Sequence, residues 1–169
     1  ATGAGPREDS MLDFNWSHTG DKPGETLKTD FRISRSDGDS DSANTTVPTM
    51  VTVDGTQHQS SDLKNGVLSV DYTRNVGQSD QLSAGVQITY DDSETVSDAT
   101  GANAASLTSD FAYQQTNSAV YVTYQKQLGD KWTVLGGVRS ETLDLKTDLS
   151  SPGGTTGHIN YTKLSPSFF

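Results

Sequence analysis

Residues 81–91 read QLSAGVQITYD, and every second residue in this stretch is apolar or small. Leu82, Val86 and Ile88 alternate with polar residues over the whole segment. Because a β-strand directs successive side chains to opposite faces, this alternation predicts a strand with one apolar and one polar face.

The same period of two recurs along most of the chain and predicts seven strands, whereas helical periodicity is nearly absent. The predicted strands cover about residues 10–19, 25–35, 66–74, 81–91, 117–128, 131–146 and 159–169. Pro166 lies in the last of them, so we expect that strand to be interrupted or to lie at a sheet edge. The predicted fold is all-β: an antiparallel up-and-down meander in which residues 1–169 form a single β-barrel segment.

The predicted connections alternate between short and long. Short turns rich in glycine, aspartate and asparagine are expected at residues 20–24, 75–80 and 129–130. Long loops are expected at about residues 36–65, 92–116 and 147–158. In an up-and-down sheet every second connection lies at the same end, so one end of the sheet has only short turns and the other end has only long loops. Transmembrane β-barrels have this asymmetry, with short periplasmic turns and long extracellular loops.

The apolar faces of these strands carry no charged residue at their central positions. On such a face an arginine or lysine at the bilayer midplane would cost about 2–4 kcal/mol. The opposite faces carry charges that suit a polar lumen: Asp30, Arg32, Asp71, Arg139 and Glu141. Arg139 and Glu141 share one face, and we expect them to pair across the lumen, as a structural ion pair rather than a catalytic one.

Two further features concern membrane crossing. Trp132 follows a short turn and Tyr90 precedes a long loop, as in the aromatic girdles of membrane barrels. Several strands approach the roughly 9–11 residues that cross a bilayer at a tilt. A soluble sandwich or a lipocalin-like barrel would alternate in the same way with its apolar face inward. Strand length and the alternation of connections favour a partial transmembrane β-barrel.

Composition excludes several functional classes. The formal net charge of -10 argues against nucleic-acid binding, which requires clustered lysine and arginine. The chain has no cysteine, which excludes disulfides, thiolate metal sites and cysteine nucleophiles. No serine lies in a nucleophile-elbow motif and no histidine–aspartate pair is suggested, so we expect no enzymatic activity. We also expect no cofactor. No apolar run is long enough for a transmembrane helix.

One acidic motif is a candidate metal site. Asp37, Asp39 and Asp41 alternate in the first predicted loop, and alternate aspartates supply oxygen ligands to calcium in some loops. An EF-hand would require glycine and glutamate where this chain has Ser42 and Pro48. The alternative is a solvated acidic loop. No ligand-binding residue is identifiable from the sequence.

Several stretches resemble the barrel region of TonB-dependent outer-membrane receptors. They are LSVDYTR at 68–74 with QLSAGV at 81–86, DFAY at 110–113 with AVYVTY at 119–124, KWTVLGGVRSET at 131–142, and YTKLSPSF at 161–168. This resemblance implies a 22-stranded barrel around an N-terminal plug in the bacterial outer membrane. It also implies energised uptake of siderophore-iron, cobalamin or oligosaccharide, with the TonB complex, membrane lipid and a small-molecule ligand as partners.

The chain departs from that family in having no plug domain and no TonB box, so we expect a barrel-wall fragment. Such a fragment has two open sheet edges, which favour edge-to-edge self-association. One alternative is a small outer-membrane barrel that acts as an adhesin or an enzyme, with an eighth strand at residues 49–53. The other is a soluble β-domain that binds carbohydrate or protein.

Overall fold

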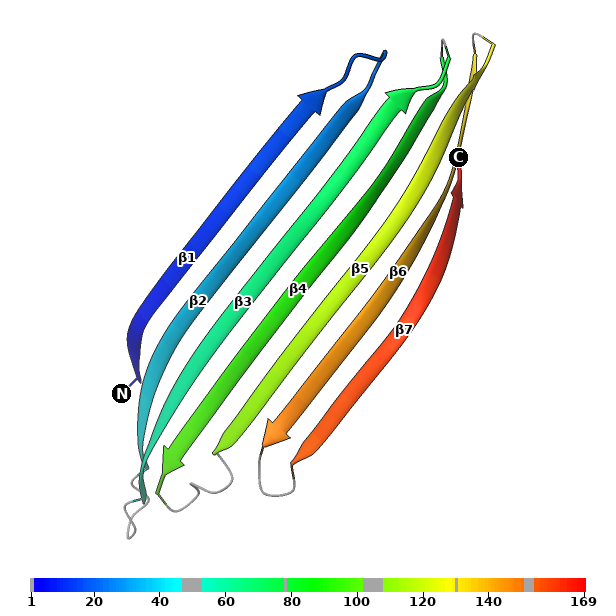
Figure 1. Cartoon of the computed structure of the whole chain (residues 1–169). Coiled ribbons are helices and arrows are strands. Elements are labelled where there is room, and N and C mark those ends of the chain that lie inside the picture. Colours follow the sequence, from blue (N-terminus) through cyan, green and yellow to red (C-terminus); the bar gives the residue numbers. More distant parts are fainter. Residues whose placement is uncertain (1, 47–52, 78, 102–107, 130, 151–153) are drawn as a thin grey trace.

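The computed structural model describes residues 2–46, 53–77, 79–101, 108–129, 131–150 and 154–169, and all regular structure there is β-strand. The strands are β1 (Thr2–Thr19), β2 (Thr26–Thr46), β3 (Val53–Asn75), β4 (Gln81–Thr100), β5 (Ser109–Leu128), β6 (Trp132–Ser150) and β7 (Thr155–Phe168). They form one seven-stranded antiparallel sheet in sequence order (Figure 1). This confirms the predicted fold class. Among the described residues, no helix has the length and apolarity to cross a membrane.

The predicted short turns lie together at one end of the sheet. Gly24, Gly77 and Gly129 lie in these turns with φ of 65°, 91° and 68°. Glycine adopts this left-handed region without the steric cost that a Cβ atom imposes. The β1–β2 turn is also joined to β3, because the backbone N–H of Asn75 donates to the carbonyl of Pro23 at 3.0 Å. The turn chemistry predicted from sequence is therefore confirmed.

The predicted long loops at 36–65, 92–116 and 147–158 are wrong in their described parts. β2 continues to Thr46, β3 begins at Val53, and β4 and β5 extend through most of the second predicted loop. Pairing gives the backbone polar groups of these segments their hydrogen-bond partners. The side chains there are mostly polar, with serine, threonine and glutamine on both faces and aspartate on one, so apolar alternation is largely missing from the sequence. We call these added parts of the strands the extensions.

Both edge strands are longer than predicted. β1 begins at Thr2, and its register against β2 shifts between Ala4 and Arg7, on either side of Pro6. β7 begins at Thr155 and continues through Pro166, which is paired with Val138. Each edge strand has one neighbour in the sheet, a position in which proline is tolerated. The suggested eighth strand at 49–53 lies outside the described residues except for Val53, which begins β3.

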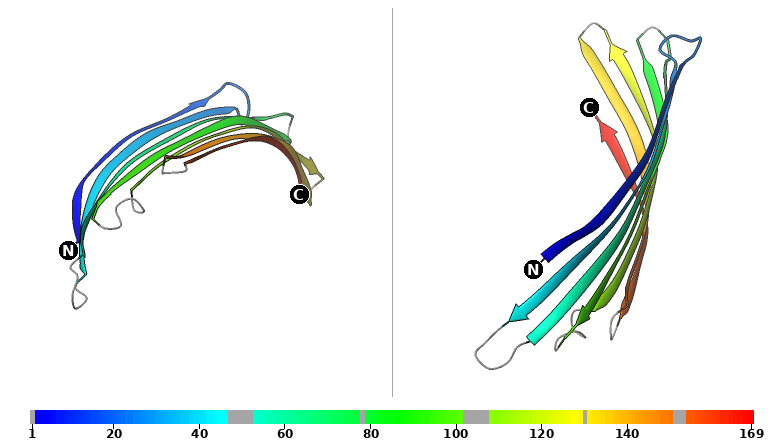
Figure 2. Two further views of the ribbon diagram at one scale, coloured as in Figure 1. Left: turned by 90° about the horizontal axis from the view of Figure 1, so that it is seen from below. Right: turned by 90° about the vertical axis from the view of Figure 1, so that its left-hand side faces the viewer.

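The sheet is an arch with a concave face, seen end-on in Figure 2. The hydroxyl of Tyr121 on β5 reaches Asp71 on β3, across β4. Arg139 on β6 likewise donates to Gln87 on β4 at 3.0 Å, across β5. Alternate strands lie about 9–10 Å apart, so these side chains meet because the face that bears them curves inward. We call this the inner face and the convex one the outer face.

Candidate membrane-facing surface and polar inner face

The apolar positions of the strands come into register on the outer face. Val70, Val86 and Val120 form one row across β3, β4 and β5. The described residues of this apolar belt are Leu12, Phe14, Trp16, Phe31, Ile33, Leu68, Val70, Val86, Ile88, Val120, Val122, Val138 and Leu164. Between these residues the outer face carries no charge. The apolar face predicted strand by strand is therefore one continuous surface.

The belt is exposed rather than packed into a core. Val120 is 55% exposed, and Ala119, its neighbour on the inner face, is 4% exposed. Ala119 is the one buried hydrophobic residue among those described. A soluble sandwich or barrel would bury its apolar face, whereas here that face is convex and polar side chains fill the concavity. An exposed apolar surface of this extent requires an apolar environment or partner.

The edge of the belt towards the extensions runs obliquely across the strands. Asn160 of β7 lies in the row that contains Leu12 of β1, and the first apolar belt residue of β7 is Leu164, four positions nearer the short turns (160 to 164). On β6 the displacement is six positions, from Asp144 to Val138. Strands spaced about 4.8 Å apart and tilted by about 40° would shift a level boundary by about seven residues over six steps. The displacement on β6, five steps from β1, is of the size that a membrane plane produces on strands with this tilt, and the displacement on β7 is smaller.

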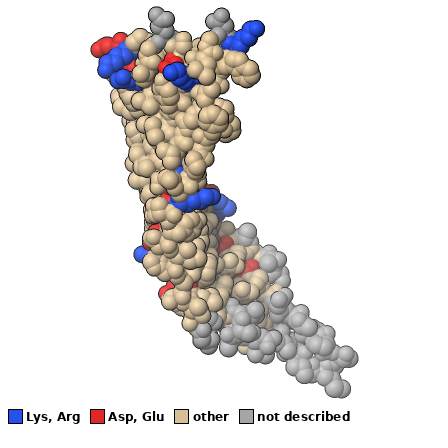
Figure 3. Space-filling model, turned by 90° about the vertical axis from the view of Figure 1, so that its right-hand side faces the viewer, with Lys and Arg blue, Asp and Glu red and all other residues tan. Residues whose placement is uncertain are grey.

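A space-filling view shows the belt from the side of β7. A zone without charge separates charges at the short-turn end, at the top, from charges lower down the sheet (Figure 3). On β4 the outer face is free of charge from Leu82 to Tyr90, which is close to the span of about 9–11 residues that crosses a bilayer.

Three tyrosines near the limits of the belt direct their hydroxyls to carboxylates. The pairs are Tyr72–Glu25 (2.6 Å), Tyr124–Asp80 (2.5 Å) and Tyr90–Asp92 (2.7 Å). The first two lie at the short-turn end and the third lies at the start of the extensions. Each ring thus borders the apolar belt while its hydroxyl reaches a polar group, the amphipathic placement that characterises interfacial aromatic residues. Tyr90 and Trp132 flank the belt as the sequence predicted.

The inner face at the level of the belt carries a connected polar network. Arg139 forms an ion pair with Glu141 at 2.6 Å, as predicted, and both side chains are half-buried. The pair lies along β6, between residues two positions apart, and not across the lumen as expected from the sequence. The guanidinium also lies over the ring of Tyr121, 5.8 Å from its centroid. Tyr121, Gln87 and Gly85 were not singled out from the sequence, because their contacts cross an intervening strand.

The candidate calcium ligands share a face but do not converge. Asp37, Asp39 and Asp41 occupy the outer face of β2, where alternate residues are about 7 Å apart. Asp37 is paired with Arg35 at 2.9 Å, and Asp41 is paired with His58 at 2.7 Å. Within the described ranges, no group of three or more histidine, cysteine, aspartate or glutamate side chains is arranged to hold a metal. The extended backbone, which was expected to be a loop, keeps these carboxylates apart.

His58 links three extensions and gives them a pH dependence. It lies in register between Asp41 of β2 and Asp98 of β4. The hydrogen bond with Asp41, and then the charges of Asp41, Asp39 and Asp98, raise the pKa of the His58 imidazole. A raised pKa means that protonation stabilises the folded extensions. This stabilisation is fully present below the unfolded pKa of about 6.5 and is lost as pH rises through the higher folded pKa.

We therefore expect amide-exchange protection in residues 56–60, corrected for intrinsic exchange rates, to decrease as pH rises above about 6.5. Substitution of His58 by glutamine should remove this dependence, because glutamine does not titrate. His158→Gln, in the pair of His158 with Asp144 on β6 and β7, is the matched control and should preserve it. An unchanged pH dependence in the His58→Gln variant would contradict this assignment.

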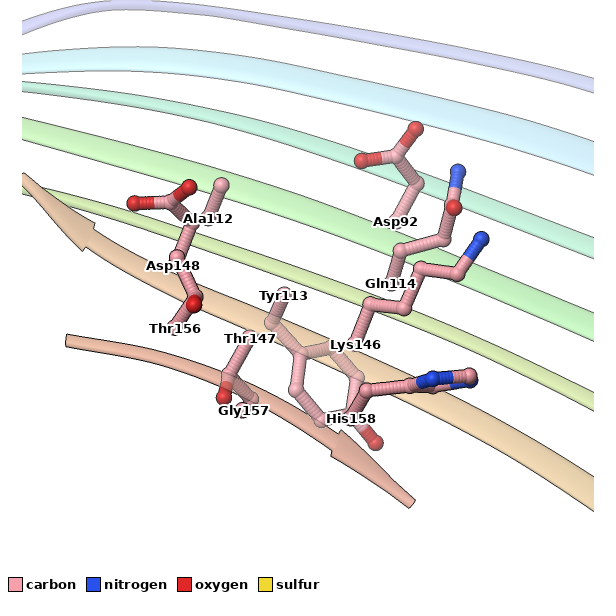
Figure 4. Close-up of a pocket in the computed structure, with 10 residues that line it drawn as sticks. All are labelled: Asp92, Ala112, Tyr113, Gln114, Lys146, Thr147, Asp148, Thr156, Gly157 and His158. Atoms are coloured by element: carbon pink, nitrogen blue, oxygen red, sulfur yellow. The ribbon is translucent and has the colours of Figure 1, made fainter. Parts of the chain in front are cut away.

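A hollow of about 590 Å³ lies on the outer face of β4–β7, beyond the belt. Lys146 and His158 project in the same direction along its side (Figure 4). Asp92 and Asp148 also line it, and His158 is paired with Asp144 at 3.0 Å. The positive and negative groups offset one another, so the hollow has no clear preference for an anion or a cation.

Comparison with known proteins agrees with this geometry. A sequence model described as an outer membrane protein beta-barrel family matches residues 18–169, which include all of β2 to β7. None of the curated proteins compared with the chain matches it.

Proposed function

The chain belongs to the outer membrane protein beta-barrel family, and from this premise we propose that it forms part of the barrel wall of a bacterial TonB-dependent receptor. Such a receptor takes up siderophore-iron, cobalamin or oligosaccharide with energy supplied through the TonB complex. The observation that carries the proposal is the continuous apolar belt on the convex face of a sheet with a polar concave face. The belt contacts lipid, and the inner face lines the passage.

The topology supports a larger barrel. β1 and β7 point in the same direction because six antiparallel steps separate them. A direct ladder between these two strands would be parallel, whereas transmembrane barrels of this class are antiparallel. In our proposal, further strands therefore lie between β7 and β1.

Energised uptake tests the proposal. Cells that carry the protein should accumulate at least one of three labelled probes: a ferric siderophore, cobalamin or a neutral oligosaccharide. Accumulation should stop when a protonophore collapses the proton gradient, because TonB-dependent transport requires that gradient. Binding that persists without energised accumulation would indicate instead a small barrel that acts as an adhesion protein, and would overturn the receptor proposal.

A further inference from the structure

Charge on the extensions is divided between the two faces of the sheet. Outer positions are heavily charged, as with Asp37 and Asp39 on β2 and Asp92 and Glu94 on β4. On the described inner positions of the β2–β7 extensions no side chain is charged, and Asp91 lies just before the β4 extension. A hairpin with water on both sides has no reason to keep charge off one face. The inner face of the extensions therefore meets something other than bulk water.

Hydroxyl and amide groups occupy most of the described inner positions in the extensions of β2, β3 and β4, with Gly38, Leu63 and Ala99 among the exceptions. One row crosses the sheet from Gly38 through Ser61 and Thr95 to Phe111 and Leu149. The neighbouring row contains Ser40, Gln59 and Ser97. Hydrogen-bonding groups without charge thus lie in register beside an apolar cluster.

That cluster, which we call the inner apolar patch, lies on β5, β6 and β7. Its residues are Phe111, Tyr113, Leu145, Leu149, Ile159 and Tyr161. Phe111 is 40% exposed, Ile159 is 54% exposed and Tyr161 is 51% exposed. The patch lies on the face opposite the apolar belt, so lipid does not cover it. An exposed apolar patch rimmed by polar groups marks a binding surface.

From this arrangement we propose that the inner face of the extensions, together with the adjoining inner apolar patch, binds an uncharged oligosaccharide. The inference rests on the proposed receptor function and selects one of its substrate classes. A sugar ring has an apolar C–H face that stacks on Phe111 or Tyr161 and hydroxyls that pair with side chains such as Ser61 and Gln59. An anionic iron chelate would lose hydration against this face without gaining an opposite charge, and desolvation of unpaired charge is costly.

Binding by the protein in lipid vesicles tests the inference. The probes are an array of neutral oligosaccharides, followed by calorimetric titration of the tightest binder, with oligogalacturonate and an anionic ferric siderophore as charged probes. We expect a neutral glycan to bind at least tenfold more tightly than either charged probe. Phe111→Ala and Tyr161→Ala should each raise its Kd by about tenfold, because buried aromatic contacts dominate binding energy. Gln114→Ala, on the outer face of β5, is the matched control and should leave the Kd unchanged.

Three results would overturn the inference: no binding across the neutral array, tighter binding of a charged probe, or an unchanged Kd in both aromatic variants. Uptake distinguishes this failure from failure of the receptor proposal. Energised accumulation of a ferric siderophore, with no glycan bound, would contradict the proposed glycan site and support the proposed receptor function. Glycan binding that depends on Phe111, without energised accumulation, would support the proposed glycan site and contradict the proposed receptor function.

Discussion

Substitution of Val86 by arginine is expected to destabilise the protein folded in a lipid bilayer by about 2–4 kcal/mol. Val86 lies midway between Leu82 and Tyr90 on the outer face of β4, in register with Val70 and Val120, and its side chain is 40% exposed. An arginine there places its guanidinium against hydrocarbon, where no group compensates for lost hydration. The free energy of unfolding, measured by urea titration in phospholipid vesicles, reports the effect.

Thr89→Arg is the matched control, three residues away on the inner face of the same strand. Because that face is polar, we expect this variant to change the free energy of unfolding by less than about 1 kcal/mol. Polarity-sensitive dyes on single cysteines give an independent readout. Labels at 86, 122 and 134 should report hydrocarbon, and labels at 87, 123 and 135 should not. Equal costs for the two arginine variants, with the first set of labels buried in protein, would show that the belt does not face lipid.

The seven strands and their faces could be predicted because both depend on local chemistry. The alternation around Val86 places each side chain on a face within a single strand, and glycines such as Gly24 and Gly129 mark the turns. Turn length then fixes the register between neighbouring strands, which is why the separately predicted apolar faces join into one belt. Each of these steps uses residues that are close in sequence.

The extensions could not be predicted because their signal is not periodic. Gln59 and Thr95 on the inner face and Asp37 on the outer face are all polar, and a stretch that is polar on both faces is as typical of a loop as of a strand. Pairing along the hairpin, and not an apolar face, makes these segments strands. The same uncertainty made Asp37 and Asp39 candidates for a calcium loop, whereas an extended backbone separates them.

Side-chain contacts between different strands also could not be predicted from the sequence. Phe111 and Leu149 become partners only once β5 and β6 are paired. The contact between Tyr121 and Asp71 additionally requires curvature, because β4 lies between them. Gly85, on that intervening strand, leaves the space in which the contact forms. A Cβ atom at Gly85 would lie 2.5 Å from the Tyr121 hydroxyl oxygen and 2.7 Å from Oδ1 of Asp71.

Substitution of Gly85 by valine is therefore expected to destabilise the folded protein by about 2.5–6 kcal/mol, the sum of overpacking and a lost hydrogen bond to a charged group. The branched side chain fills the space between Tyr121 and Asp71 and forces their contact apart. Urea titration in phospholipid vesicles measures the loss. The matched control is Gly136→Val on the outer face of β6, where a Cβ atom would meet no other atom within 4 Å. Gly136→Val should change the free energy of unfolding by less than about 0.5 kcal/mol.

A double-mutant cycle separates the loss of space from a general cost of valine at position 85. In a Tyr121→Ser background the ring is absent, so Gly85→Val should cost at least about 1 kcal/mol less than in the original chain. Additive costs would mean that Gly85 and Tyr121 act independently, and the steric explanation would then be wrong. Coupling of this size would show that a missing side chain on β4 allows β3 and β5 to be connected across it. The inward curve of the sheet would then depend in part on a glycine whose φ lies outside the left-handed region.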